Sequence, residues 1–325
     1  MEAILSFLSI LSSIIFPLET IDGNSLIFVG KSMIDSRVIK VKSSISDVYD
    51  TKYFKTDQRT VVYFHDWQSG PTNESVLTIV DAFKEHGGYN IIIADWTGAA
   101  KNKKYHQFVD SVQNVAHTYV EILQKLRREC YDMDKLFLVG HGVGAHICGA
   151  IGREFSSEKH LRLKRITGLD PVDHMFKKRH TYNIFGFELA FTANQALSRD
   201  DARFVDIIHT NAGQIGSKFS SGDIDFWVNG GSKSHPGCNK CVKKYGEDSL
   251  DCNICFHDMA WRYYAQSVWG STKSYKATLC NSGASTYNAR NCNNTQKAYI
   301  GYYADYSNNY GNYYINFIKC YYDPK

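Results

Sequence analysis

The chain has 325 residues, of which 43% are hydrophobic and 14% aromatic, and this composition excludes a disordered or fibrous protein. A nucleic-acid partner is not expected, because the formal net charge is only +4 and no arginine-rich stretch accompanies it. We therefore expect one globular unit with a sizeable buried core.

The first residues form an apolar run, MEAILSFLSILSSIIFPLE, that ends near Pro17. The run is short, terminal and followed by ordinary polar sequence, which is typical of a secretory signal peptide over about residues 1–20 and not of a membrane span. Glu2 stands where such peptides usually carry a positive charge, so a buried terminal strand or helix is the alternative. We expect a secreted, extracellular protein whose mature chain, residues 21–325, has no integral membrane span.

After this run, apolar segments alternate with segments of helical periodicity. Predicted strands lie in TVVYFHDW (60–67), YNIIIADW (89–96), DKLFLVGHGVG (134–144), LKRITGLDPV (163–172) and FVDIIHTN (204–211). Predicted helices are ESVLTIVDAFKEHGG (74–88), HQFVDSVQNVAHTYVEILQKLRREC (106–130) and GAHICGAIGREF (144–155). This alternation predicts an α/β protein with a mainly parallel central sheet and helices on both faces. Beyond about Lys273 the chain is rich in tyrosine and alternates as edge strands do.

A glycine-rich corner joins one predicted strand to the helix that follows it. Gly140, Gly142 and Gly144 have the spacing of a sharp turn that, in many hydrolases, presents a serine at its centre. Here the centre is Gly142, so neither backbone strain nor a nucleophile is expected there. The alternative of a dinucleotide-binding loop is weaker, because the spacing is not G-x-G-x-x-G and the expected acidic residue about 20 positions on is absent.

Six of the nine cysteines lie between Cys238 and Cys292. Two Cys-x-x-Cys pairs flank a polar loop in CNKCVKKYGEDSLDCNIC (238–255), a pattern that also occurs at zinc sites. The exported context favours disulfides. Joining outer with outer and inner with inner, Cys238–Cys255 and Cys241–Cys252, gives one antiparallel register across a hairpin and a small stapled flap. Zinc remains the alternative.

The other cysteines and two sequons complete the expected covalent features. Cys280 and Cys292 are expected to form a third bridge, which leaves Cys130, Cys148 and Cys320. Cys148, inside a predicted buried helix, is expected to be an inert core thiol. Asn73 and Asn293 head acceptor triplets for N-glycosylation, which are compatible with export.

Six motifs occur in a characteristic order and spacing: LVGHGVGAHICG, ITGLDPV, DDARFVDIIHTN, DIDFWVNGG, HPGC and CFHDMAWRYYAQSV. Over roughly residues 58–320 the chain resembles the animal pancreatic lipase family, and especially its short insect members, which include phospholipases of the A-one class and catalytically silent yolk proteins. The resemblance implies an α/β-hydrolase fold, secretion and a carboxylic-ester site of serine, aspartate and histidine.

The resemblance assigns the acid of that site to Asp170 in GLDP and the base to His257 in CFHD, while the nucleophile position is the vacant Gly142. Losing the nucleophile of a triad hydrolase costs on the order of a millionfold in turnover. Asp170 and His257 therefore have an alternative reading as a buried hydrogen-bonded pair that only stabilises the flap.

A second departure concerns the oxyanion hole. The family has His-Gly followed by an aromatic residue, whereas this chain has His65-Asp66-Trp67. The backbone amides of Trp67 and Val143 are the expected donors, and Asp66 brings a carboxylate towards the place where negative charge would develop. His65 and His141 are expected to be core histidines, and no metal site or cofactor is expected.

The resemblance also bears on ligands and partners. The flap between Cys238 and Cys255 and the loop after IIHT are short, which in relatives accompanies phospholipid-type access. We expect no carboxy-terminal β-sandwich of the kind found in the family, and therefore no colipase-like partner. We expect an inactive lipase-like protein that binds a lipid or other apolar ligand, or serves as a storage or secretion component. The alternative is a weak or reassigned ester hydrolase that uses His257 and Asp170.

Overall fold

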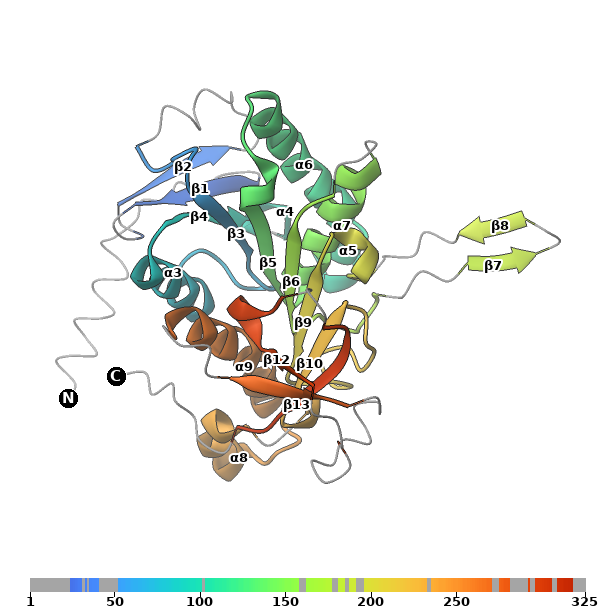
Figure 1. Ribbon diagram of the computed structural model, residues 1–325. Coiled ribbons are helices and arrows are strands. Elements are labelled where there is room, and N and C mark those ends of the chain that lie inside the picture. The colour runs from blue at the N-terminus through green and yellow to red at the C-terminus, as the bar shows by residue number, and fades with distance from the viewer. Residues whose placement is uncertain are drawn as a thin grey trace.

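The computed structural model is built on one large sheet (Figure 1). It describes residues 24–30, 33, 35–40, 52–100, 103–157, 162–176, 181–184, 187–190, 196–232, 235–270, 275–280, 292, 296–305 and 309–317. The expected signal peptide, the acceptor Asn293 and the cysteine Cys320 lie outside these residues.

Eleven strands form the sheet, in the order β12-β11-β13-β10-β9-β6-β5-β3-β4-β1-β2. Their bounds are β1 Ser25–Val29, β2 Ser36–Lys40, β3 Arg59–Phe64, β4 Tyr89–Asp95, β5 Leu136–His141, β6 Arg165–Leu169, β9 Val205–His209, β10 Ile224–Val228, β11 Lys276–Leu279, β12 Lys297–Tyr299 and β13 Gly311–Ile315. All strands from β13 to β4 in this order run parallel, and the strands beyond them at both edges are antiparallel. The expected mainly parallel sheet is confirmed.

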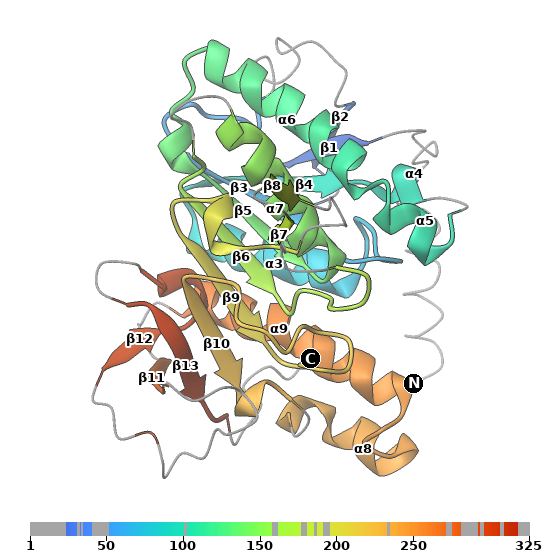
Figure 2. The same ribbon diagram turned by 90° about the vertical axis from the view of Figure 1, so that its right-hand side faces the viewer.

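Helices cover both faces of this sheet (Figures 1 and 2). The helices are α3 Glu74–His86, α4 Thr97–Ala100, α5 Tyr105–Val109, α6 Val112–Arg128, α7 Val143–Ser157, α8 Asn239–Tyr245 and α9 Leu250–Trp269. Short 3-10 turns occupy η1 Met133–Lys135, η2 Arg199–Asp201, η3 Asn229–Gly231, η4 Pro236–Cys238 and η6 Gly301–Tyr303. Two further strands, β7 Thr181–Ile184 and β8 Phe187–Ala190, form a separate antiparallel hairpin.

The alternation of side chains along each strand divides the core into two layers. In β3, Val62 and Phe64 belong to a buried cluster with α6 and α7, while Val61 and Tyr63 belong to a second cluster with α3 and α9. Because both faces are covered, the central strands read as nearly continuous apolar runs, and β9 and β10 are buried along their whole length.

Three features differ from the expectations. The helix predicted over 106–130 is interrupted: α5 ends at Val109 and α6 begins at Val112, because the hydroxyl and the amide of Ser111 both donate to the carbonyl of Phe108. Strands β1 and β2 were not predicted. β13 is not an edge strand, since it lies between β10 and β11.

The flap is a pair of helices and not the expected hairpin of strands, while the expected nested pairing of its cysteines is confirmed. Disulfides join Cys238 to Cys255 and Cys241 to Cys252, across α8 and the start of α9. Cysteines three residues apart share one helical face, so two antiparallel helices produce the same nested pairing that strands would. With these four cysteines in disulfides, the zinc alternative has no thiolate ligands here.

The remaining cysteines are described in part. Cys280 is joined to Cys292, as expected. Cys148 is buried in α7, and burial raises the pKa of its thiol, which agrees with an inert core residue. Cys130 is exposed and free. Within the described part of the chain, no helix combines the length and apolar character that a bilayer-spanning helix needs.

Removing the inner staple should destabilise the protein. The variant Cys241→Ser, Cys252→Ser opens a loop with a sequence separation of 11, and the lost chain restriction should lower the free energy of unfolding by about 3 kcal/mol. Denaturant unfolding without reductant measures this, with Cys130→Ser as the matched control that removes an unpaired thiol. Equal stability of the two variants would contradict a closed disulfide.

Candidate active site

The glycine corner joins β5 to α7 at the carboxyl edge of the sheet. Gly142 has a φ of 55°, in the left-handed region that glycine adopts without strain, and its amide donates to the carbonyl of Leu169 at 3.0 Å. A Cβ at Gly140 would overlap the backbone of Gly144, so strand and helix approach closely here. The backbone of an elbow is therefore present, with no side chain at its centre.

Asp170 and His257 meet beside this corner. Asp170 directly follows β6 and is fully buried, and its Oδ2 lies 2.7 Å from Nδ1 of His257 on α9. Its Oδ1 accepts hydrogen bonds from the backbone amides of Thr210 and Asn211 at 2.8 and 3.0 Å. The structure thus brings the expected acid and base together, and both are held by the carboxyl ends of neighbouring strands and by α9.

Asp66 fills the space left by the missing side chain. This residue comes shortly after β3, and any Cβ at Gly142 would overlap its carboxylate. One carboxylate oxygen accepts the amide of Val143 at 2.7 Å, and the other lies 3.1 Å from Nε2 of His257. The carboxylate therefore occupies the position of a nucleophile and takes up an amide that the sequence assigned to the oxyanion hole.

The imidazole of His257 is held between two carboxylates. Burial alone would lower its pKa, but the hydrogen bonds to Asp170 and Asp66 and the charges of both raise the pKa to about 10. Burial would raise the pKa of Asp66, yet the hydrogen bond and charge of His257 outweigh it and lower that pKa to about 2. At neutral pH the three groups form an ionised row, and a protonated imidazole has no lone pair with which to act as a base.

The stability that His257 contributes should fall as the pH rises. Its pKa increases from the ordinary 6.5 to about 10 on folding, so the contribution is complete below pH 6.5 and is lost between there and about pH 10. The slope should reach about 1.4 kcal/mol per pH unit. Urea unfolding between pH 6 and 10 measures it, and in Asp66→Asn, which removes one of the two partner charges, the fall in stability should end at a lower pH. A fall that ends at the same pH in both proteins would contradict the double pairing.

A metal-binding reading of the same residues is disfavoured by ring geometry. Asp66, His141 and His257 each present one possible ligand atom, and these atoms lie within 4.8 Å of one another. The two imidazole rings are stacked, with centroids 4.4 Å apart and planes 26° apart. A metal bound by histidine lies near the plane of each ring, and two nearly parallel planes share no nearby point. We assign no metal to this cluster.

The remaining predicted residues are placed as follows. The ring of Trp67 packs against Trp96 and Phe108. His65 is fully buried and stacks on Trp96 at 4.7 Å, and His141 is buried as well, as expected of core histidines. Asn73 is exposed and immediately precedes α3.

The role of Asp66 was only partly foreseeable. Its departure from the family pattern was visible, as was its proximity to the oxyanion position. The signal that could have revealed the position of its carboxylate is the combination of two replacements. Residue 66 is aspartate where the family pattern has glycine, and residue 142 is glycine where a serine would stand.

The mainly parallel sheet, the glycine corner after β5, and an acid and a base that follow it in chain order define an α/β hydrolase. A family model described as Lipase matches residues 16–318, and the chain belongs to this lipase family.

Several curated proteins are similar to the chain. Lipase member H-B of Xenopus laevis is 27% identical over 268 residues, which cover 78% of this chain and 52% of the relative. Pancreatic triacylglycerol lipase of Myocastor coypus is 25% identical, over 84% of this chain and 58% of the relative. Phospholipase A1 VesT1.02 of Vespa tropica is 28% identical, over 63% of this chain and 64% of the relative. The chain thus spans about half the length of the first two curated relatives.

Proposed function

We propose that this protein is a catalytically inactive member of the lipase family. One observation carries the proposal: the Asp66 carboxylate lies where a serine side chain would project from residue 142, and it binds both His257 and the amide of Val143. The site therefore has no hydroxyl to acylate, and a fixed negative charge stands where the negative charge of a tetrahedral intermediate would form.

We further propose that the protein is secreted and retains affinity for a lipid or another apolar ligand, as a storage or secretion component. The apolar run at residues 1–20, the disulfides of the described residues and the exposed acceptor Asn73 support export. The names of two relatives, a triacylglycerol lipase and a phospholipase, support a lipid ligand. A sheet that extends from β1 to β13 supports a single hydrolase domain over residues 21–325.

The alternative, in which His257 activates water against a bound ester, is less well supported. Both ring nitrogens of His257 already face carboxylates, at 2.7 and 3.1 Å, and the raised pKa keeps the ring protonated at neutral pH. A general base needs a free lone pair near the pH at which it works.

Labelling with a fluorophosphonate tests the proposed inactivity. The probe reacts only with an activated hydroxyl, so the native protein should remain unlabelled and should not hydrolyse a short-chain nitrophenyl ester or phosphatidylcholine. A pancreatic triacylglycerol lipase treated in parallel shows that the probe is reactive. Labelling of the native protein, or phospholipid cleavage at a rate typical of enzymes, about 10 per second, would overturn the proposal.

The proposed lipid affinity has its own test. Organic extraction of protein purified without detergent, followed by mass spectrometry, should recover a lipid in near-stoichiometric amount. Sedimentation with phosphatidylcholine vesicles provides a second measurement. If the purified protein contains no lipid and does not sediment with vesicles, the proposed lipid affinity is wrong.

A further inference from the structure

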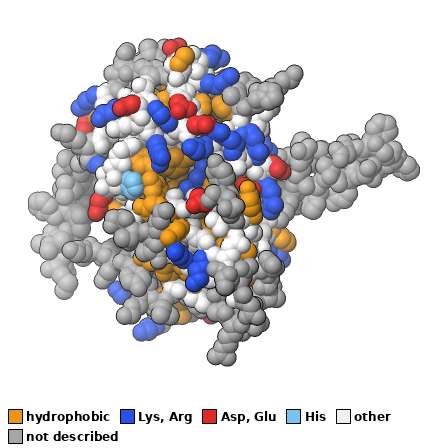
Figure 3. Space-filling model, viewed as in Figure 1, with side chains coloured by type: hydrophobic (Ala, Val, Ile, Leu, Met, Phe, Trp, Pro, Cys, Tyr) orange, Lys and Arg blue, Asp and Glu red, His pale blue; other side chains and the backbone are white. Residues whose placement is uncertain are grey.

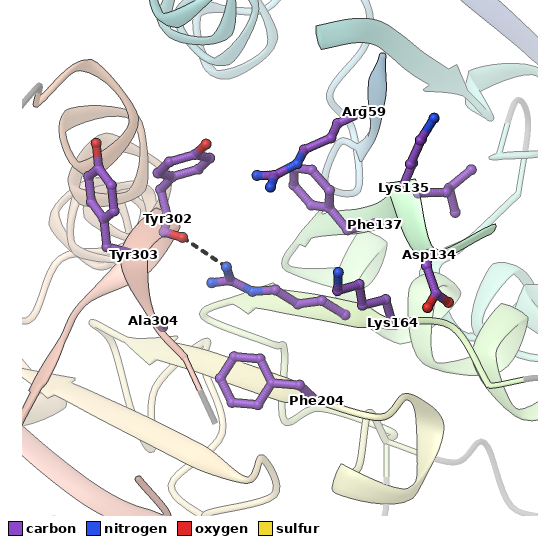
Figure 4. Close-up of a pocket in the computed structure, with 11 residues that line it drawn as sticks. Arg59, Asp134, Lys135, Phe137, Lys164, Phe204, Tyr302, Tyr303 and Ala304 are labelled. Carbon is purple, nitrogen blue, oxygen red and sulfur yellow. Dashed lines mark hydrogen bonds between the residues drawn. The ribbon is translucent and has the colours of Figure 1, made fainter. Parts of the chain in front are cut away.

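A cavity of about 350 Å³ opens at the edge of the sheet opposite to the glycine corner (Figure 4). It is lined by residues at the amino ends of β3, β5 and β6, by the residue before β9 and by η6. Its volume lies within the range of small-molecule sites. Because it shares no residue with the candidate active site, an inference about it does not depend on the proposed inactivity.

Some of the charge at this cavity is already neutralised. Arg165 forms an ion pair with Asp206, with 2.8 Å between Nε and Oδ1, and also donates to the carbonyl of Tyr302 at 2.9 Å. Asp134, the one acid among the lining residues, is paired with Arg203. Because Asp206 and Asp134 are each paired with an arginine, neither adds an unpaired negative charge near the cavity.

Three further cations line the cavity without a carboxylate partner among the described residues. Arg59 donates to the hydroxyl of Tyr89 at 3.5 Å, Lys135 donates to the carbonyl of Thr56 at 3.4 Å, and the third is Lys164. Figure 4 shows Arg59 and Lys164 reaching into the space between the rings that border it. Figure 3 shows Lys and Arg side chains gathered beside an apolar hollow on this face. The free charge of the cavity is positive.

Aromatic rings form its walls. Phe204 is 2% exposed and has the guanidinium carbon of Arg165 at 5.4 Å from its ring centre. Tyr302 is fixed twice, because its hydroxyl lies 2.6 Å from that of Tyr89 and its amide donates to the hydroxyl of Ser267 at 2.9 Å. Phe137 provides a third ring. The walls are therefore held in place before any ligand enters, which reduces the ordering cost of binding.

We propose that this cavity binds a flat aromatic molecule that carries one anionic group, such as an aryl carboxylate, sulfonate or phosphate. The rings of Phe137 and Tyr302, both partly exposed, offer faces and edges on which a planar ring packs better than a flexible alkyl chain. Arg59 and Lys164 supply the charge that would bind the anion, with hydrogen bonds strengthened by the charge on both partners.

Isothermal titration calorimetry with 2-naphthoate tests this proposal. Native protein should bind one equivalent, and the variant Arg59→Gln, Lys164→Gln should bind about tenfold more weakly because two charge-assisted contacts are lost. Lys240→Gln, Lys243→Gln, which removes the same charge from α8 in the flap, is the matched control and should bind as the native protein does.

Three other ligands complete the experiment. The uncharged 2-naphthylmethanol, inorganic phosphate and dodecanoate should each bind more weakly than 2-naphthoate, because each lacks the anion or the ring. Equal binding of naphthylmethanol would show that the cations take no part, and equal binding of phosphate or dodecanoate would show that the ring is not recognised. Any of these results, absence of naphthoate binding, or equal affinity in all protein variants would overturn the proposal.

Discussion

The double variant Asp66→Gly, Gly142→Ser is expected to react with a fluorophosphonate and to hydrolyse a short-chain nitrophenyl ester, whereas neither single variant does so. The double replacement returns a hydroxyl to the elbow and frees both the Val143 amide and Nε2 of His257. Since removal of a triad nucleophile costs about a millionfold in turnover, even an imperfectly aligned serine should raise the rate by about a thousandfold or more.

The single variants separate the two defects. Gly142→Ser alone places a Cβ on the Asp66 carboxylate, so we expect it to be destabilised by about 1–3 kcal/mol and to stay unlabelled. Asp66→Gly alone frees the amide of Val143 and Nε2 of His257 but supplies no hydroxyl. Adding His257→Gln to the double variant should abolish labelling again. If Gly142→Ser were labelled without any change at residue 66, the blocking role of Asp66 would be wrong.

The second large effect concerns stability. Asp170→Ala should lower the free energy of unfolding by about 3–5 kcal/mol, because it leaves the buried charge of His257 and the amides of Thr210 and Asn211 with one acceptor fewer each. Asp134→Ala, which breaks the exposed pair with Arg203, is the control and should cost only about 0–1 kcal/mol. Urea unfolding at pH 7 measures both. Equal losses would mean that the row of Asp170, His257 and Asp66 contributes little to the fold.

The parallel part of the fold was predictable because its strands are buried on both faces. β4 and β9 contain short apolar runs, Ile91–Ala94 and Ile207–Ile208, within segments that are bounded by turns, and such runs can be recognised in the sequence. β2 was not predicted, since Ser36–Lys40 mixes polar and apolar residues and becomes a strand only through pairing with β1. The position of β13 inside the sheet is likewise set by its partners and not by its own residues.

The candidate site divides in the same way. Asp170, His257 and Gly142 could be located because the chemistry of a hydrolase demands these positions in this order. The position of the Asp66 carboxylate could not be predicted, because it depends on the space that is left by the missing side chain of Gly142, 76 positions further along the chain. The cysteine spacing gave the correct pairing but not the helices, since both hairpin geometries satisfy it.

The carboxylate of Asp66 has a counterpart in the chemistry of ester cleavage. Hydrolysis of a carboxylic ester leaves an acid whose oxygens lie against the elbow amide and the imidazole, which are the two partners of Asp66. The protein thus carries, on one of its own side chains, a group equivalent to a retained carboxylate product. A tethered competitor acts at an effective concentration in the millimolar range or above, so free fatty acids should not displace it from the elbow.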